Sequence, residues 1–132
     1  MKVQTANSEA IMTPAPVALR NLQRHFKETY GFNLSQIEIM LESSSKSLVQ
    51  AFDNASEALK SDNSQEQLVP VFHGLKGLLL NMGENNWAAF ARDVEQKLEG
   101  GLLADFDRIV AEMQVGMTDI LFYCRDKGQE NS

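Results

Sequence analysis

Residues 73 to 77, with the sequence His-Gly-Leu-Lys-Gly, place a nucleophilic side chain and a cation one helical turn apart. An exposed imidazole is mostly neutral at pH 7, so that His73 would offer the lone pair of one ring nitrogen. Lys76 would disfavour the imidazolium further and would attract the oxygens of a phosphoryl group. The pair therefore indicates nucleophilic chemistry at the imidazole. No carboxylate stands within a turn on the exposed side of this helix, unless Glu84 or another helix supplies one.

Two glycines, Gly74 and Gly77, follow His73 directly and follow Lys76 directly, within a stretch that otherwise favours a helix. Gly74 and Gly77 each cost about 1 kcal/mol relative to alanine in a helix interior. On a helical wheel of about 100° per residue, His73, Gly77, Leu80 and Glu84 lie opposite the apolar residues Leu68, Val71, Phe72, Leu75, Leu78, Leu79 and Met82. We therefore expect His73 to face solvent, with Gly77 leaving space for another protein to approach. Gly74 has no such role that follows from its position alone.

The hydrophobic pattern predicts helices throughout the chain, with short breaks between them. Apolar residues recur at intervals of three, four and seven over residues 16–29, 34–60, 64–82, 85–98 and 103–126. Amphipathic helices joined by short connections favour an all-α protein, arranged as an antiparallel up-and-down four-helix bundle. The additional short N-terminal helix would lie across one end of the four longer ones. Trp87 is expected to pack its helix onto the preceding one near Gly83.

The ends of this domain follow from polar and proline-containing stretches. Residues 1–15 are polar and weakly periodic, so they are predicted to be a tail or linker before a helical domain over 16–128. Pro70 lies three residues before His73 and cannot donate a backbone hydrogen bond. Either the regular helix begins after Ser64 or it kinks at Pro70.

Length and composition limit the classes of protein to which this chain can belong. The chain has 132 residues, a net charge of −6 and a hydrophobic fraction of 43%, which suit one globular domain that needs no metal or disulfide to fold. The acidic balance argues against nucleic acid as a partner. No apolar run approaches a membrane span and no signal peptide is apparent. Together with a single cysteine, Cys124, these features favour the cytoplasm, and a monomer is expected.

Other residues that could do chemistry are assigned structural roles. His25 has Glu28 rather than a lysine one turn on, and it has no glycine neighbours, so a structural position at the surface is expected. The two histidines and the one cysteine lie far apart and match no zinc-binding spacing. No metal site is therefore expected in this chain.

A resemblance to a known family is carried by residues 71–83 and 87–95. They read Val-Phe-His-Gly-Leu-Lys-Gly-Leu-Leu-Leu-Asn-Met-Gly and Trp-Ala-Ala-Phe-Ala-Arg-Asp-Val-Glu, and they resemble the signature of histidine-containing phosphotransfer (HPt) domains. The family pattern has a histidine, then Leu-Lys-Gly, a glycine six residues further on, and hydrophobic positions with an acidic residue on the next helix. Gly74 departs from it, because the family often has a small polar or longer residue there.

The resemblance implies a role for each matching residue. His73 would be phosphorylated on its Nε2 atom, and Lys76 would lie beside the phosphoryl group. Gly77 would leave room for a docking receiver domain, and Leu80 would belong to the docking surface. Glu84 and Gly74, on the same presumed face, are further candidates for partner docking.

The resemblance also implies the function and the partners. The protein would be a phosphoryl carrier of a two-component phosphorelay, without autokinase activity, since the chain is too short for a kinase core and has no glycine-rich phosphate loop. It would take the phosphoryl group from the receiver domain of a hybrid sensor histidine kinase and pass it to a response regulator. No cofactor would be bound by this chain, because Mg²⁺ is expected on the receiver domain.

Two alternatives come from other classes of protein. One is a non-catalytic adaptor that keeps the fold and binds a signalling partner without being phosphorylated. The other is a structural helical bundle within an assembly, which a large exposed apolar face on the first or last helix would favour.

Overall fold

The regular secondary structure of the described residues is helical, as the sequence predicts. The computed structural model describes residues 12–102 and 105–125, and these residues contain no strand. The helices are α2 (Leu19–Tyr30), α3 (Leu34–Leu59), α4 (Ser64–Asn81), α5 (Asn85–Glu99), α6 (Phe106–Gly116) and α7 (Thr118–Leu121). The first predicted helix, over 16–29, thus begins three residues late, because its N-cap Ala18 has an extended backbone.

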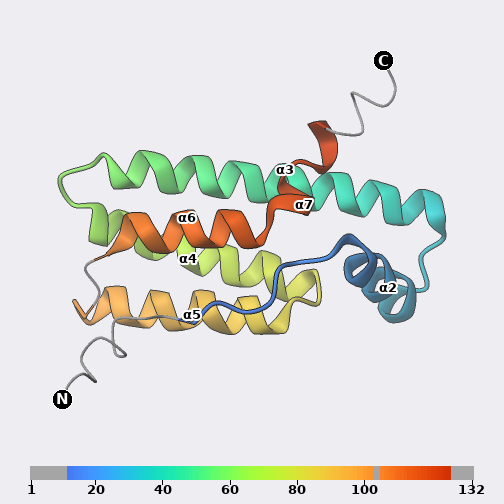
Figure 1. The fold of residues 1–132 in the computed structure, drawn as a ribbon, viewed down its shortest axis with the longest axis horizontal. Coiled ribbons are helices and arrows are strands. Elements are labelled where there is room, and N and C mark those ends of the chain that lie inside the picture. Colours follow the sequence, from blue (N-terminus) through green and yellow to red (C-terminus); the bar gives the residue numbers. More distant parts are fainter. Residues whose placement is uncertain (1–11, 103–104, 126–132) are drawn as a thin grey trace.

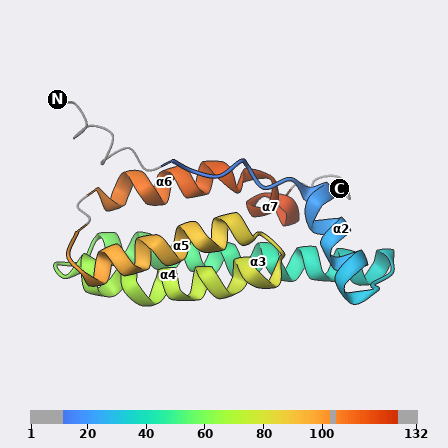
Figure 2. The same cartoon turned by 90° about the horizontal axis from the view of Figure 1, so that it is seen from below.

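Four helices lie side by side and alternate in direction. Helices α3, α4, α5 and α6 run back and forth along the long axis, and α2 lies at the end where α4 turns into α5 (Figures 1 and 2). Helix α4 packs against α3 on one side and α5 on the other. The short connections explain this order, since helices joined by a few residues pack as antiparallel neighbours.

Helix α4 is held by a row of fully buried side chains. Leu68, Phe72, Leu75 and Leu79 recur at intervals of three and four and lie in the single core of the described residues. Burying each such side chain contributes roughly 1.5–3 kcal/mol. This row therefore offsets the cost of the two glycines within the same helix.

A glycine-terminated turn fixes the pairing of α4 with α5. Gly83 has a φ of 77°, in the left-handed region that favours glycine. The backbone N–H of Glu84 donates to the carbonyl of Leu79 at 2.9 Å, and the N–H of Gly83 donates to that of Leu80 at 3.1 Å. These two bonds form a Schellman motif, which ends α4 and reverses the chain directly into α5.

The helix predicted over residues 103–126 is broken, which corrects that expectation. Helix α6 ends at Gly116 and α7 begins at Thr118; residues 103, 104 and 126 lie outside the described residues. The carbonyl of Gly116 accepts a hydrogen bond from the N–H of Val17 at 2.8 Å. A Cβ on Gly116 would collide with the indole of Trp87. The break therefore coincides with two contacts that only the tertiary structure brings together.

Trp87 makes two contacts that the sequence did not predict. Its indole lies against Gly116 of α6, and its Nε1 atom donates to the carbonyl of Ala15 at 2.8 Å. The extended N-terminal segment runs along α5 and α6 before it enters α2 (Figures 1 and 2). Ala15, the last residue of the predicted tail or linker, thus contacts the helical domain; residues 1–11 lie outside the described residues.

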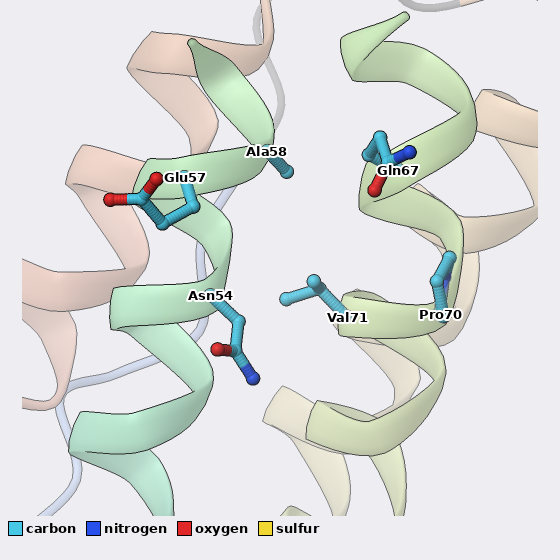
Figure 3. A pocket seen from close by; sticks show the side chains of 6 residues that line it. All are labelled: Asn54, Glu57, Ala58, Gln67, Pro70 and Val71. Carbon is cyan, nitrogen blue, oxygen red and sulfur yellow. The ribbon is translucent and has the colours of Figure 1, made fainter. Parts of the chain in front are cut away.

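Pro70 lies within a continuous helix that begins at Ser64, so of the two alternatives the later start of the regular helix does not apply. Pro70 has no N–H for the carbonyl of Glu66, and both residues are exposed, so water can bind that carbonyl. Pro70 lines a groove of about 410 Å³ between α3 and α4 (Figure 3). The groove is also lined by Asn54, Glu57, Ala58, Gln67 and Val71.

Replacing Gly116 by alanine should destabilise the protein. The added methyl group would overlap the Trp87 ring, which is 1% exposed and has little room to move. Such overpacking costs about 1–3 kcal/mol, and urea unfolding would measure the loss in free energy of unfolding.

Gly74→Ala is the matched control for this substitution. A Cβ at Gly74 would meet nothing within 4 Å, so the alanine should stabilise the helix by up to about 1 kcal/mol. Equal effects of the two substitutions would contradict the packing role given to Gly116.

Candidate functional site

The imidazole of His73 projects from the middle of α4 into solvent. Its side chain is 66% exposed, whereas Phe72 and Leu75, its neighbours along the helix, are buried. This agrees with the position of His73 on the helical wheel. A ring carried by an anchored helix and open to solvent can be approached by another macromolecule.

A carboxylate from α5 contacts this imidazole. The Oε2 atom of Glu95 lies 3.2 Å from Nδ1 of His73, and its Oε1 atom lies 3.9 Å from Nζ of Lys76. The side chain of Glu95 is only 14% exposed, so it approaches the imidazole from the packed side of the α4–α5 pair. The site is therefore a triad of His73, Lys76 and Glu95 built on two helices.

The contact with Glu95 determines which ring nitrogen is free. An ionised carboxylate only accepts hydrogen bonds, so Nδ1 of His73 must carry the proton in this contact. In a neutral imidazole the other nitrogen, Nε2, then keeps its lone pair. The arrangement thus leaves the lone pair of Nε2 free and holds the ring through Nδ1.

Lys76 lies close to the imidazole without pairing tightly to any carboxylate. Its side chain is 28% exposed, and the 3.9 Å separation from Glu95 is at the limit of an ion pair. Partly exposed pairs of this kind contribute up to about 1 kcal/mol to stability. The ammonium group is therefore held near His73 while it remains able to bind a further anion.

The face of α4 around His73 is open. A Cβ built on Gly77 or on Gly74 would meet nothing within 4 Å, and Leu80 is 51% exposed. By helical periodicity, Gly77 and Leu80 lie on the same face of the helix as the imidazole. The exposed backbone and leucine beside the imidazole are therefore accessible to a docking surface.

Glu84 lies apart from the imidazole, at the turn between α4 and α5. It follows His73 by eleven positions, and the helix from His73 to its end at Asn81 alone rises roughly 12 Å. Burial raises the pKa of the Glu84 carboxyl above its ordinary value, and the nearby His25 lowers it in part. Glu84 is thus not the carboxylate beside His73, a position that Glu95 takes.

His25 has a structural environment, as the sequence predicts. Its Nε2 lies 3.2 Å from the carbonyl oxygen of Asn81, and its Nδ1 lies 3.1 Å from the hydroxyl of Thr29. A Cβ on Gly83 would overlap its ring. Both nitrogens of His25 are therefore engaged, and the side chain joins α2 to the end of α4.

Glu95 is the site residue whose contact the sequence did not predict. Its type and its place on the next helix are visible in the sequence, but no carboxylate was expected beside His73 on the same helix. The signal lies in the reversal at Gly83: two antiparallel helices joined there place residues 73–76 opposite residue 95. Residues that lie equally far before and after this reversal in the sequence face each other on the two helices. The contact between His73 and Glu95 could therefore have been predicted from the sequence.

Residues 12–102 and 105–125 contain no group of three His, Cys, Asp or Glu side chains able to hold a metal ion. Among the same residues, no helix combines the length and apolarity needed to span a membrane.

Comparison with protein-family models, with curated proteins and with solved structures found no match.

The position of Glu84 predicts a pH dependence of stability. Because its pKa is raised by folding, the folded protein holds this proton to higher pH than the unfolded chain does. Stability is therefore lost as the pH rises from the ordinary pKa through the raised one. Glu84→Gln should increase the urea midpoint at pH 7 and change it little at pH 4. An equal change at both pH values would contradict this assignment.

Proposed function

We propose that this protein is a phosphorelay intermediate of the HPt type. His73 accepts a phosphoryl group from an aspartyl phosphate on a receiver domain and passes it to a response regulator. The observation that carries the proposal is the bond between Glu95 and Nδ1 of His73, which leaves Nε2 exposed as a nucleophile. The resemblance of residues 71–83 and 87–95 to the HPt signature, and four helices of alternating direction, support the same function.

The transfer step follows from the geometry of the imidazole. The Nε2 lone pair attacks phosphorus in line with the leaving aspartyl oxygen, so that an N–P bond forms as the P–O bond breaks. The leaving group departs as a carboxylate on the receiver domain. The phosphorylated ring keeps its proton on Nδ1 and gains a positive charge, which the carboxylate of Glu95 stabilises. Passing the phosphoryl group to a second aspartate reverses these bonds.

The remaining residues of the site have supporting roles in this proposal. Lys76 neutralises charge on the phosphoryl oxygens, and Gly77 and Leu80 contact the docked receiver domain. Gly74 and Glu84 belong to the wider docking surface. The receiver domain supplies Mg²⁺ and most catalytic groups, so the protein acts as a carrier without autokinase activity. A cytoplasmic monomer suits this role, because one exposed histidine is sufficient.

A second candidate function is a helical adaptor or a structural part of an assembly. An apolar groove of about 740 Å³ lies between α3 and the α6–α7 segment, lined by Val49, Phe52, Asp53, Ala111, Gln114, Val115, Thr118, Leu121 and Phe122. Val115 and Phe122 at its edge are exposed. Contiguous exposed apolar surface favours binding of another protein. The adaptor hypothesis gives no reason for the contact between Glu95 and His73.

Phosphoryl labelling separates the two candidates. The full chain, incubated with a phosphorylated receiver domain and Mg²⁺, should acquire a label that acid removes and base does not. His73→Gln should abolish the label with the helical circular dichroism unchanged. His25→Gln is the matched control and should keep it. Absence of label on the wild-type chain, or its persistence in His73→Gln, would overturn the proposal.

Substitution of Glu95 tests its role in positioning the imidazole. Glu95→Ala should slow transfer by roughly tenfold to a hundredfold, which corresponds to the loss of one charge-assisted hydrogen bond. The ¹⁵N chemical shifts of the His73 ring should report that protonation is no longer fixed on Nδ1.

Glu95→Gln is the conservative control. Its amide oxygen can still accept the bond from Nδ1, so the tautomer should be retained while the favourable charge is lost. Transfer should be intermediate between wild type and Glu95→Ala. If Glu95→Ala leaves the ring shifts unchanged, Glu95 has no such positioning role.

A further inference from the structure

Helix α2 carries a basic stripe on its outer face. Arg20, Arg24 and Lys27 follow one another at intervals of four and three residues, so they lie in one row along the helix. All three are exposed. Leu22 and Phe26, which attach α2 to the core, are completely buried on the opposite side. The stripe therefore faces away from the protein.

The stripe is distinctive in an acidic protein. Helix α2 has three cations and one acidic residue, Glu28, whereas the rest of the described chain has seven Lys and Arg against fourteen Asp and Glu. Elsewhere Lys60, Lys76, Lys97 and Arg108 pair with carboxylates. Within the described ranges, none of the three cations on α2 forms an ion pair. The three cations of this face are thus left without an ion pair by the described residues.

The helix that carries the stripe is anchored firmly. His25 bonds to the carbonyl of Asn81 at the end of α4, and the left-handed Gly31 ends the helix. Asn33 and Gln36 then form a capping box that starts α3. Because α2 is held at His25 and ends at a defined cap, the three cations keep a constant backbone spacing. Less conformational entropy is then lost on binding.

We propose that Arg20, Arg24 and Lys27 bind a short acidic segment of a partner protein. Arg20 and Lys27 are seven positions apart, a rise of about 10 Å, which matches the length of a segment with a few carboxylates. A longer polyanion fits less well, since a nucleic acid carries a charge every ~1.7 Å and would extend over the acidic remainder of the surface. A flat anionic membrane would meet the same repulsion. This proposal goes beyond the phosphorelay function and does not require phosphorylation of His73.

Titration with an acidic peptide tests the proposal. The full ¹⁵N-labelled chain is titrated with a twelve-residue peptide of glutamate and alanine at 20 and 150 mM salt. The largest amide shifts should lie in Leu19–Tyr30, and binding should weaken at the higher salt. Arg20→Glu with Arg24→Glu should weaken binding by about tenfold, as expected for the loss of two exposed charge pairs and their replacement by repulsion.

Lys46→Glu with Lys60→Glu is the control of equal charge change. Both lysines lie outside α2 and are exposed, so this double variant should bind the peptide within about twofold of wild type. Equal weakening by both double variants would mean that net charge alone acts, and would overturn the proposal. So would the absence of binding at 20 mM salt. Tighter binding of duplex DNA or of phosphatidylserine vesicles than of the peptide would overturn the proposal that the ligand of this face is an acidic protein segment.

Discussion

The pairing of α4 with α5 is the constraint on which the candidate site depends. Glu95 reaches Nδ1 of His73 only because the chain reverses tightly at Gly83 and the two helices then lie side by side. The carboxylate is mostly buried while the imidazole is mostly exposed. A hydrogen bond between a shielded carboxylate and an exposed ring fixes the ring orientation without blocking Nε2. The same carboxylate lies close to Lys76, so that one residue organises the other two.

Helix α4 has one side that is buried and stabilises the protein, and another side that is accessible from solvent. The core side buries large apolar residues without interruption, whereas the outer side has glycine at positions 74 and 77. The glycines lower helix propensity by roughly 2 kcal/mol in total, and the burial of Phe72 and Leu75 alone outweighs that cost. The helix can therefore remain rigid where it displays bare backbone to solvent. This combination suits a site that another protein must approach closely.

At Gly83 and Gly116, glycine has a different function from the one it has on the outer side of α4. Gly83 adopts a positive φ and lies under the ring of His25, which ties α2 to the α4–α5 turn. Gly116 admits the indole of Trp87, and its carbonyl binds the N-terminal segment at Val17. At both positions a side chain would overlap an aromatic ring from a distant part of the chain. These glycines serve close packing, whereas Gly77 leaves open space.

The sequence alone determined the local features of this protein. Periodicity predicted the helices, their buried faces and the exposure of His73, because these depend on which side chains recur along one helix. The contact of Glu95 with His73, the break after Gly116 and the position of Trp87 were decided by the tertiary structure. Each depends on groups far apart in the chain, whose distances are set only when the helices pack. A helical wheel contains no information about the neighbouring helix, so it could not supply the carboxylate that orients the imidazole.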